Sequence, residues 1–383
     1  MRELSECRIL IVDDVKANID IIVEALRGEY KLSVALDGTS ALRICERQPP
    51  DLVLLDILMP GIDGYEVCRR LRAAEATREV PVMFLSSLED AVDKARGFEA
   101  GGNDYLSKPF ELLEVKARVR SLLKAKAYAD AVKEAMARDL RIAREIQMGI
   151  LPADPAGIAA GTGLDVHAAL EPAQQVGGDL YEVLRVDGDR VVVALGDVSG
   201  KGVPAALFMA VVVTLLRTMS RLHAEPDEIL RRLNDELARQ NPRDMFVTLQ
   251  CLVFDPRRRR VTGANAGHHE LVVLSPGRPP RRAFGATGRM VGILPDNPVT
   301  GESMELAPGD TLVLFSDGVT EAMNGREEML GEERLLEHLG AAGGSTAAET
   351  VASVLAAVSG HVAGAKQFDD ITVVAVRFDP GKP

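Results

Sequence analysis

The sequence predicts a doubly wound α/β domain with a five-stranded parallel sheet, then a long helix, then an α+β sandwich. Apolar runs alternate with helical patterns over the first third of the chain, which is typical of a parallel sheet covered by helices on both faces. No glycine or proline interrupts the stretch from Leu122 to Met148, which therefore predicts one continuous helix. Beyond Pro152, strands and helices fall into separate groups, as they do in α+β folds.

Composition narrows the classes of protein to which the chain can belong. The formal net charge of −12 over 383 residues argues against broad binding to nucleic acid or to anionic membranes. The longest apolar run, Val203–Leu216, is too short to span a bilayer, and Pro204 suits the first turn of a buried helix. The start has no apolar signal-peptide region, so we expect a cytoplasmic protein without membrane insertion. The four cysteines are scattered without CxxC spacing, which fits a reducing compartment: Cys7, Cys45, Cys68 and Cys251.

Five strand signals define the first domain, and polar residues follow four of them. The apolar runs are RILIV, KLSVA, DLVLLD, VPVMFLS and NDYLSKPF. Function gathers beyond the carboxyl ends of the strands in such folds, so these polar residues should converge. The carboxylates can hold Mg²⁺, the lysine can pair with an anion, and Asp56 becomes a candidate nucleophile for a phosphoryl group, unless the residues only cap loops. The residues are Asp13, Asp14, Asp56, Ser86 and Lys108.

The stretches VDDVKAN, LLDILMPGIDGYE, FLSS and DYLSKPF resemble the receiver domains of two-component response regulators, over about Arg8 to Leu123. The resemblance implies that Asp56 accepts a phosphoryl group from a sensor histidine kinase or a phosphotransfer protein. It also implies a Mg²⁺ site, phosphoryl-binding residues and an aromatic switch. Asp13, Asp14 and the Leu58 carbonyl would bind the metal. Ser86 and Lys108 would bind the phosphoryl group, and Tyr105 would be the aromatic switch. Pro109 is expected to follow a cis peptide bond.

The linker from Leu122 to Ile150 carries apolar or small residues at alternating spacings of three and four, with Asp139 as the one break. This seam predicts a coiled coil, and hence a homodimer through the helix. The alternative is a single amphipathic helix packed on one of its own domains. We place the boundaries at 1–124 for the first domain, 125–151 for the linker and 152–383 for the second domain. The seam residues are Leu122, Ala125, Ala129, Val132, Met136, Ala143, Ile146 and Ile150.

Two glycine-rich stretches open the second domain, VGGDLY (Val176–Tyr181) and GDVSGKG (Gly196–Gly202). The segment between them reads as two strands joined by a turn at Asp187–Asp189, so the two ends should meet. Asp179 and Asp197 would then lie close together, and burying two like charges is costly unless a cation joins them. Oxygen ligands suit Mg²⁺ or Mn²⁺. The alternative is two turn aspartates that each cap their own loop.

Two later stretches add acidic residues at strand ends. FSDGVTEAMN places Asp317 after an apolar run, and QFDDITVVAV places Asp369 and Asp370 before another one. Acidic residues at four strand ends have the right chemistry for a dinuclear metal centre.

Five motifs resemble those of the metal-dependent PPM family of serine/threonine phosphatases, in particular its bacterial SpoIIE-like branch: VGGDLY, GDVSGKG, NAGHHE, SDGVTEAMN and FDDITVV. The resemblance covers about Leu140 to Phe378. It implies an enzyme with two or more Mn²⁺ or Mg²⁺ ions that acts on phosphoserine or phosphothreonine, with a STAS-type anti-sigma-factor antagonist as substrate. It implies that Asp179 and Asp197 bridge or flank the ions with help from the Val198 carbonyl. It also implies that Asp317 and Asp369 bind the second ion. Asp370 stands where many relatives have asparagine, and Lys201 is a candidate phosphate contact.

Other functions leave part of the sequence unexplained. VGGDLY superficially resembles the GGDEF signature of a diguanylate cyclase, but that interpretation gives Asp317 and Asp369 no role. A phosphorylation-controlled module that binds a partner without hydrolysis is a second alternative, and the complete acidic set argues against it. Arg257–Arg260 is more typical of a solvated hairpin tip than of an anion site, and we interpret His268 and His269 as structural.

Overall fold

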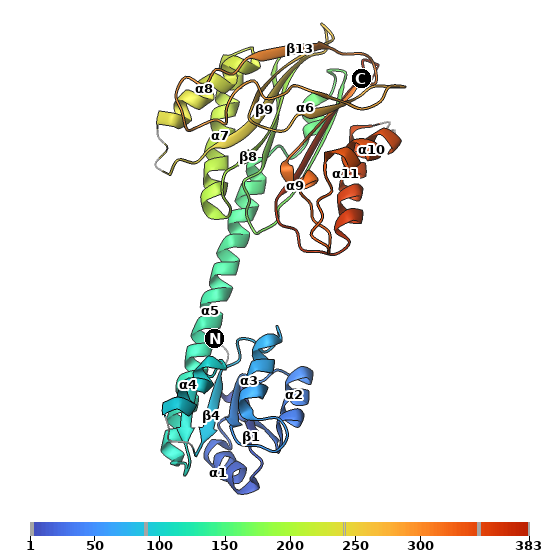
Figure 1. Cartoon of the computed structure of the whole chain (residues 1–383). Helices are drawn as coiled ribbons and strands as arrows, with labels where there is room; N and C mark the ends of the chain where they lie inside the picture. The colour runs from blue at the N-terminus through green and yellow to red at the C-terminus, as the bar shows by residue number, and fades with distance from the viewer. Residues whose placement is uncertain (1–3, 88–90, 240, 242, 343–345, 382–383) are drawn as a thin grey trace. The chain divides into compact units, whose positions relative to one another are not determined.

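The computed structural model describes residues 4–87, 91–239, 241, 243–342 and 346–381. The chain divides into two compact units, Met1–Arg138 and Asp139–Pro383 (Figure 1). Helix α5 (Leu112–Ile150) contributes residues to both units.

The first unit alternates strands and helices. After a short 3-10 helix at Leu4–Glu6, its elements are β1 (Arg8–Val12), α1 (Lys16–Leu26), β2 (Lys31–Ala35), α2 (Gly38–Arg47), β3 (Leu52–Asp56), α3 (Gly64–Ala73), β4 (Val82–Ser86), α4 (Ala91–Glu99) and β5 (Asp104–Ser107). All five strands run parallel in the order β2-β1-β3-β4-β5, which confirms the predicted doubly wound sheet.

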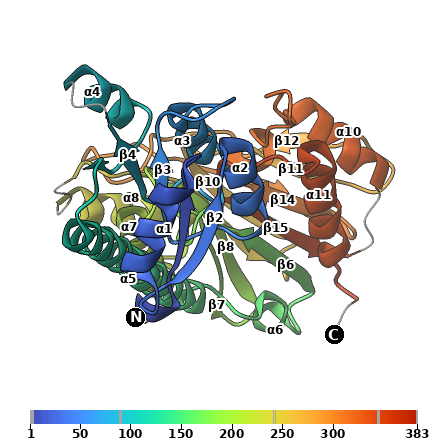
Figure 2. The ribbon, with the colours of Figure 1, turned by 90° about the horizontal axis from the view of Figure 1, so that it is seen from below.

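Helices cover both faces of this sheet (Figure 2). Successive strand residues point to opposite faces, so Leu10 packs with α2 and α3, whereas Ile9 packs with α1 and the start of α5. Side-chain caps fix where α2 and α3 begin. The Asp37 carboxylate accepts the Ser40 N–H at 2.8 Å, and Asp63 likewise caps α3.

Helix α5 is 39 residues long, which confirms the predicted continuous linker helix. It begins at Leu112, ten residues before the predicted helical stretch at Leu122, because its first turns belong to the first core, where Val115 and Val119 are buried. Further along, large apolar side chains on α5 are exposed within the part of the chain that the structure describes. They are Tyr128, Val132, Met136, Ile142, Ile146 and Met148.

The second unit is a sandwich of two five-stranded sheets flanked by helices, as predicted. Its elements are α6 (Pro155–Ala159), β6 (Leu164–Glu171), β7 (Leu180–Asp187), β8 (Arg190–Val198), α7 (Val203–Leu222), α8 (Pro226–Arg239), β9 (Val247–Asp255), β10 (Arg260–Ala266), β11 (Leu271–Leu274), β12 (Arg281–Ala283), β13 (Gly301–Glu305), β14 (Thr311–Phe315), α9 (Asp317–Thr320), α10 (Glu332–Ala342), α11 (Ala347–Val362) and β15 (Ile371–Phe378). One sheet has the order β13-β10-β9-β8-β7 and the other β12-β11-β14-β15-β6.

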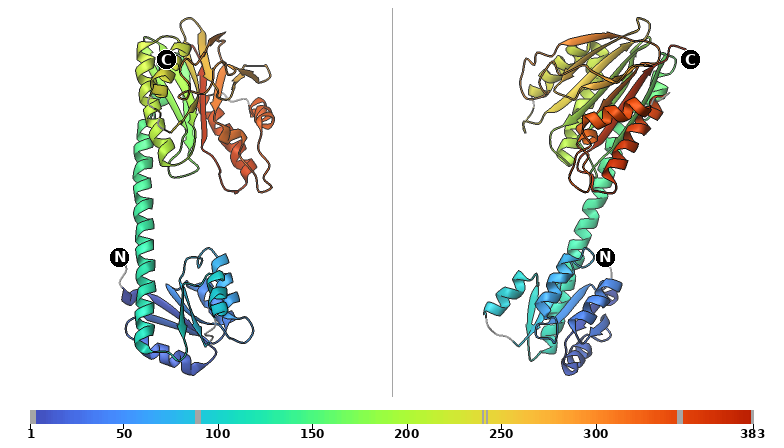
Figure 3. Two further views of the ribbon diagram at one scale, coloured as in Figure 1. Left: turned by 60° about the vertical axis from the view of Figure 1, so that its left-hand side comes forward. Right: turned by 45° about the vertical axis from the view of Figure 1, so that its right-hand side comes forward.

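The helices of this unit lie on the outer faces of the sandwich. Figure 3 shows α7 and α8 against the first of these sheets and α10 and α11 against the second. Helix α7 is long and apolar enough to cross a membrane by length and composition alone. Its residues Met209, Val212 and Leu216 are fully buried against the sheet, as in the core helix of a globular domain.

The second unit also contains short elements and turns that its apolar runs do not mark. The segment after Pro152 contains α6, because the Asp154 carboxylate caps the helix at the Gly157 N–H and proline suits its first turn. Strands β12 and β13 were missed because they are largely exposed and lack an apolar run. The arginine-rich stretch forms the turn between β9 and β10, which confirms the predicted hairpin tip. There Arg257 pairs with Asp189, and Arg258 pairs with Asp255.

Candidate functional site

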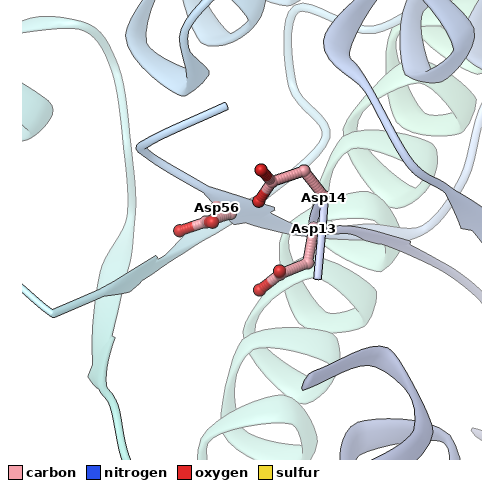
Figure 4. Close-up of side chains that lie close together, drawn as sticks. All are labelled: Asp13, Asp14 and Asp56. Atoms are coloured by element: carbon pink, nitrogen blue, oxygen red, sulfur yellow. The ribbon is translucent and has the colours of Figure 1, made fainter. Parts of the chain in front are cut away.

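The first sheet brings three aspartates together at the carboxyl ends of β1 and β3. Asp13 and Asp14 follow β1, Asp56 ends β3, and the two strands are neighbours. One carboxylate oxygen of each residue lies within 4.8 Å of the others (Figure 4). Asp13 and Asp56 are buried and Asp14 is exposed. Three carboxylates that reach one point are a suitable oxygen set for Mg²⁺.

Lys108 adds a cation to this group. Its Nζ atom lies 2.8 Å from Asp13 Oδ2 and 2.9 Å from Asp56 Oδ1. Burial lowers the pKa of Lys108, but the hydrogen bonds to Asp13 and Asp56 outweigh this effect and raise the pKa overall. Burial raises the pKa of Asp56, and the hydrogen bond from Lys108 opposes that rise. The ammonium therefore stays charged beside the candidate nucleophile, where it can attract an incoming phosphoryl group.

The other receiver residues occupy the places that the sequence predicted for them. Ser86 is buried at the end of β4, the strand next to that of Asp56. The bond between Lys108 and Pro109 is cis. Leu58 turns its side chain to solvent, and the role of its carbonyl stays a prediction.

Tyr105 lies inside the receiver rather than on its surface. Its ring centroid is 5.3 Å from that of Phe84 and 5.2 Å from that of Phe98, in tilted and edge-on contacts. Gly97 on α4 faces the hydroxyl, and a Cβ atom at position 97 would lie 1.3 Å from Tyr105 Oη. The inward tyrosine therefore requires glycine at position 97.

In the second unit, the β7–β8 hairpin places Asp179 beside Asp197, as predicted. Burial raises the pKa of Asp179 well above its ordinary value, and the charge of Asp197 raises it further. Burial raises the pKa of Asp197 to about 7, with the charges of Asp317 and Asp369 adding to the effect. Carboxylates in this setting are costly to keep charged without a cation.

The second sheet of the sandwich supplies two more aspartates at the same site. Asp317 begins α9 directly after β14, Asp369 precedes β15, and these two strands are antiparallel neighbours. Burial raises the pKa of Asp317, and the charge of Asp369 adds to it. Lys201, from the GDVSGKG stretch, donates to Asp369 Oδ2 at 2.9 Å and to the Phe368 carbonyl at 2.8 Å. Both sheets thus contribute to one acidic site.

Asp370 has different partners from Asp369. Its carboxylate accepts the backbone N–H of Ala173 at 2.8 Å and of Gly178 at 2.9 Å, with Asp179 N–H at 3.4 Å. These bonds hold the loop that carries Asp179. The role of Asp370 as a metal ligand stays a prediction.

Glycine keeps space open beside the oxygen atoms of this site. A Cβ atom at Gly178 would lie 2.6 Å from the Val198 carbonyl oxygen and 3.1 Å from Asp197 Oδ1. The donors around that space are all oxygens, so the residues fit Mg²⁺ or Mn²⁺. Among the described residues, only the three receiver aspartates bring one carboxylate oxygen each within 4.8 Å of one another. The second set is spread more widely, which is compatible with ligands of two ions about 3.5–4 Å apart.

His268 forms hydrogen bonds to both sheets of the second unit, to β9 and to β14. It is buried, with Nδ1 2.8 Å from Thr248 Oγ1 and Nε2 3.2 Å from the Phe315 carbonyl oxygen. Burial lowers the pKa of His268 to about 3, so the ring is neutral at physiological pH. These contacts support a structural role. His269 is half-buried, and its Nδ1 lies 3.6 Å from Glu332.

Gln147 was not predicted from the sequence as a functional residue. It lies on the last turns of α5 and is buried against the loop before β7. Its Nε2 donates to the Gly177 carbonyl at 2.7 Å, and the Gly177 N–H donates to its Oε1 at 3.2 Å. Arg217 of α7 also holds the helix end, donating to the Ile150 carbonyl at 2.5 Å and to Glu182 at 2.6 Å. No signal in the sequence pairs a helical glutamine with a glycine thirty residues later.

Comparison with known proteins matches both units. The Stage II sporulation protein E (SpoIIE) family matches residues 187–379, and the response regulator receiver domain family matches residues 9–120. The Response regulator PleD of Caulobacter vibrioides is 40% identical over 136 residues, which cover 35% of this chain and 30% of PleD. Protein IcfG of Synechocystis sp. is 30% identical over 290 residues, which cover 68% of this chain and 44% of IcfG. The chain thus spans less than half the length of either relative.

Solved structures resemble the second unit. The SiaA-PP2C domain of Pseudomonas aeruginosa has a TM-score of 0.59 and 25% identity, and the match covers 65% of this chain and 99% of that domain. A SpoIIE structure from Bacillus subtilis, with its PP2C phosphatase domain and a fragment of its regulatory domain, has a TM-score of 0.50 and 20% identity. That match covers 56% of this chain and 64% of the SpoIIE chain, and it supports the fold alone. The chain belongs to the SpoIIE family, with a PPM-type phosphatase domain that follows an N-terminal response regulator receiver domain.

Proposed function

We propose that the chain is a two-component response regulator whose output is metal-dependent dephosphorylation of phosphoserine or phosphothreonine on a protein, under the control of phosphorylation at Asp56. The observation that carries the proposal is the pair of acidic sites, one in each unit. Lys108 touches Asp13 and Asp56 in the first, and two sheets contribute Asp179, Asp197, Asp317 and Asp369 to the second.

The residues of the second site have distinct roles in this proposal. Asp179 and Asp197 would hold or bridge the ions with the Val198 carbonyl, and Asp317 and Asp369 would hold the second ion. Bound Mn²⁺ or Mg²⁺ would supply an acidified water and neutralise charge on the phosphate. Lys201 reaches Asp369 from a half-exposed position, so its ammonium can also contact a phosphate oxygen.

The partners follow from the same proposal. A sensor histidine kinase or a phosphotransfer protein would supply the phosphoryl group to Asp56. The substrate would be a phosphorylated STAS-type anti-sigma-factor antagonist, and the site of action the cytoplasm.

Helix α5 would carry the signal between the two activities. Gln147 and Arg217 fix its end to the loop before β7 and to α7, so a change in the helix can alter the position of Asp179. The exposed apolar side chains along the helix, such as Val132 and Met136, would pair with those of a second chain in a homodimer.

The direct test of the enzymatic activity is Mn²⁺-dependent release of phosphate from an aryl phosphate such as p-nitrophenyl phosphate by the full chain. Asp197→Asn should reduce this release to background while the circular dichroism spectrum stays unchanged. Full activity of that variant would disprove the assigned metal centre. A folded wild-type chain that binds Mn²⁺ but releases no phosphate would instead favour a partner-binding module.

A further inference from the structure

A pocket of about 240 Å³ lies in the second unit, between α11, the segment after α9 and the loop before β15. Its wall is mainly apolar, with Ala322, Met323, Leu355, Val358, Val362 and Ile371 among the lining residues. These side chains come from three separate segments of the chain. The pocket is therefore part of the tertiary structure rather than the groove of a single helix.

The pocket adjoins the acidic site. Asp369, which we assign to the second ion, lines the pocket, and so does Gly318, the residue after Asp317. One residue of extended chain spans about 3.3–3.6 Å, so residues next to a phosphoserine bound by an ion at Asp317 and Asp369 can reach the pocket.

Phe368 marks the side of the pocket that a protein partner can approach. It lines the pocket, directly precedes Asp369, and is 60% exposed. Exposed aromatic side chains are enriched where proteins contact one another. Its carbonyl accepts a hydrogen bond from Lys201, which fixes the backbone of this loop relative to the acidic site.

Charges on the rim restrict which side chain can enter. Glu171 and Glu321 line the pocket with Lys366, and among the described residues neither glutamate forms an ion pair. The charges of the glutamates disfavour an acidic side chain, and Lys366 on the same rim disfavours a basic one. The mainly apolar wall favours an apolar side chain over a neutral polar one, which would lose hydrogen bonds to water on entering. An unbranched or γ-branched apolar side chain, such as leucine or methionine, fits these charges and this wall.

We propose that this pocket is a specificity subsite, which receives an apolar side chain from a residue that flanks the phosphorylated serine or threonine of the protein substrate. The inference rests on the proposed phosphatase function and adds a requirement for the sequence around the phosphorylated residue. Aryl phosphates have no such flanking residue, so their hydrolysis is independent of the pocket.

The test uses the full chain with Mn²⁺ and a set of phosphoserine heptapeptides in an alanine–glycine background. Each peptide carries a single leucine at one position from three before to three after the phosphoserine. Burial of a leucine side chain should raise kcat/KM by about tenfold at one or two of these positions. Aspartate at the same positions should give no such gain.

Variants of the pocket test whether the leucine preference depends on the pocket while hydrolysis of the phosphate does not. Ser359 lines the pocket from the exposed side of α11, so Ser359→Trp should abolish the leucine preference and change kcat/KM for p-nitrophenyl phosphate by less than twofold. Ala356→Trp is the matched control, because Ala356 is exposed on the same helix but does not line the pocket. Met323→Ala enlarges the pocket and should shift the preference from leucine toward phenylalanine.

The possible outcomes are distinguishable. If p-nitrophenyl phosphate is not hydrolysed by the folded, Mn²⁺-loaded wild-type chain, the proposed function fails. If it is hydrolysed but no leucine position raises kcat/KM, the subsite is disproved. A leucine preference that survives both Ser359→Trp and Met323→Ala unchanged also disproves it.

Discussion

Gln147 and Gly177 exchange two hydrogen bonds, one from the side-chain amide to the Gly177 carbonyl and one from the Gly177 N–H to the side-chain oxygen. Gly177 lies two residues before Asp179, and a Cβ atom at position 177 would lie 1.8 Å from Asp370 Oδ2. The same short loop is therefore held from one side by Gln147 and from the other by Asp370. The end of α5 thus contacts the backbone that positions a candidate metal ligand.

We expect Gln147→Ala to impair the phosphatase site without altering the receiver. The substitution leaves the buried N–H and carbonyl of Gly177 without their partner, which costs about 1–3 kcal/mol. Part of that cost should appear as displacement of the Asp179 loop, so kcat for p-nitrophenyl phosphate should fall by about tenfold. The measurement is steady-state kinetics at saturating Mn²⁺.

Glu145→Gln is the matched control for this variant, because Glu145 is exposed on the same helical turns. It should retain wild-type kcat. Equal rates for Gln147→Ala and the control would show that the two hydrogen bonds do not position the loop.

Lys201→Met should strengthen binding of Mn²⁺ to the full chain. The Lys201 ammonium lies 2.9 Å from Asp369 Oδ2 and competes electrostatically with a cation at that carboxylate. Two unit charges about 4 Å apart in water interact by about 1 kcal/mol, which corresponds to about a fivefold change in affinity. Titration calorimetry on the metal-free protein measures the change directly.

The control for the lysine prediction is Lys366→Met, which removes an exposed lysine nearby that makes no ion pair among the described residues. Its Mn²⁺ affinity should stay within twofold of the wild type. If Lys201→Met binds Mn²⁺ no more tightly than this control, Lys201 does not oppose the cation. A higher KM for phosphopeptides in Lys201→Met alone would further support its contact with the phosphate.

The sequence predicted the parts of these sites that depend on local patterns. Asp56, Asp197 and Asp317 follow apolar runs, and a strand end is visible in such a run. The hairpin between Asp179 and Asp197 was visible for the same reason, because a turn signal separates two apolar stretches.

Contacts between distant segments were not predictable in this way. Asp370 binds the N–H of Gly178, 192 residues away along the chain, and only the packing of β15 beside β6 and close to β7 brings them together. The same applies to Gln147, whose place in the heptad pattern carries no information about Gly177. The exposed strands β12 and β13 are held by pairing with their neighbours rather than by an apolar pattern of their own.

Gly97→Ala should destabilise the receiver through Tyr105. The added methyl group would overlap the tyrosine hydroxyl, so the ring must leave its place between Phe84 and Phe98. Overpacking of this kind typically costs about 1–3 kcal/mol. The loss should appear as faster amide hydrogen exchange in β5 of the full chain.

A double-mutant cycle isolates this contact. In a Tyr105→Ala background, Gly97→Ala should cost much less, because the overlapping tyrosine atoms are gone and only Phe84 Cε2, 3.2 Å from the added Cβ, stays close. Gly149→Ala is the matched helical control, since a Cβ atom there meets nothing within 4 Å. An equal cost of Gly97→Ala in both backgrounds would contradict the proposed dependence of Tyr105 on Gly97.

Coupling between the two activities should run through α5. One uninterrupted helix runs from the first core, at Val115, to the loop contact at Gln147. A helix transmits a change in rotation or register, whereas a flexible insertion does not. Phosphorylation of Asp56 adds charge beside Lys108, and we expect it to activate the phosphatase by changing how the helix pairs with that of a second chain.

Val132→Pro and an insertion of two glycines after Met136 both interrupt this helix in its exposed middle part. Each variant should keep its basal hydrolysis of p-nitrophenyl phosphate and its labelling by acetyl phosphate, because both sites lie outside the altered turns. Each should lose the increase in activity that acetyl phosphate gives the wild type. Asp56→Asn provides the comparison, since it should lose the labelling and the response together. An undiminished response in both helix variants would mean that the signal reaches the Asp179 loop by another route.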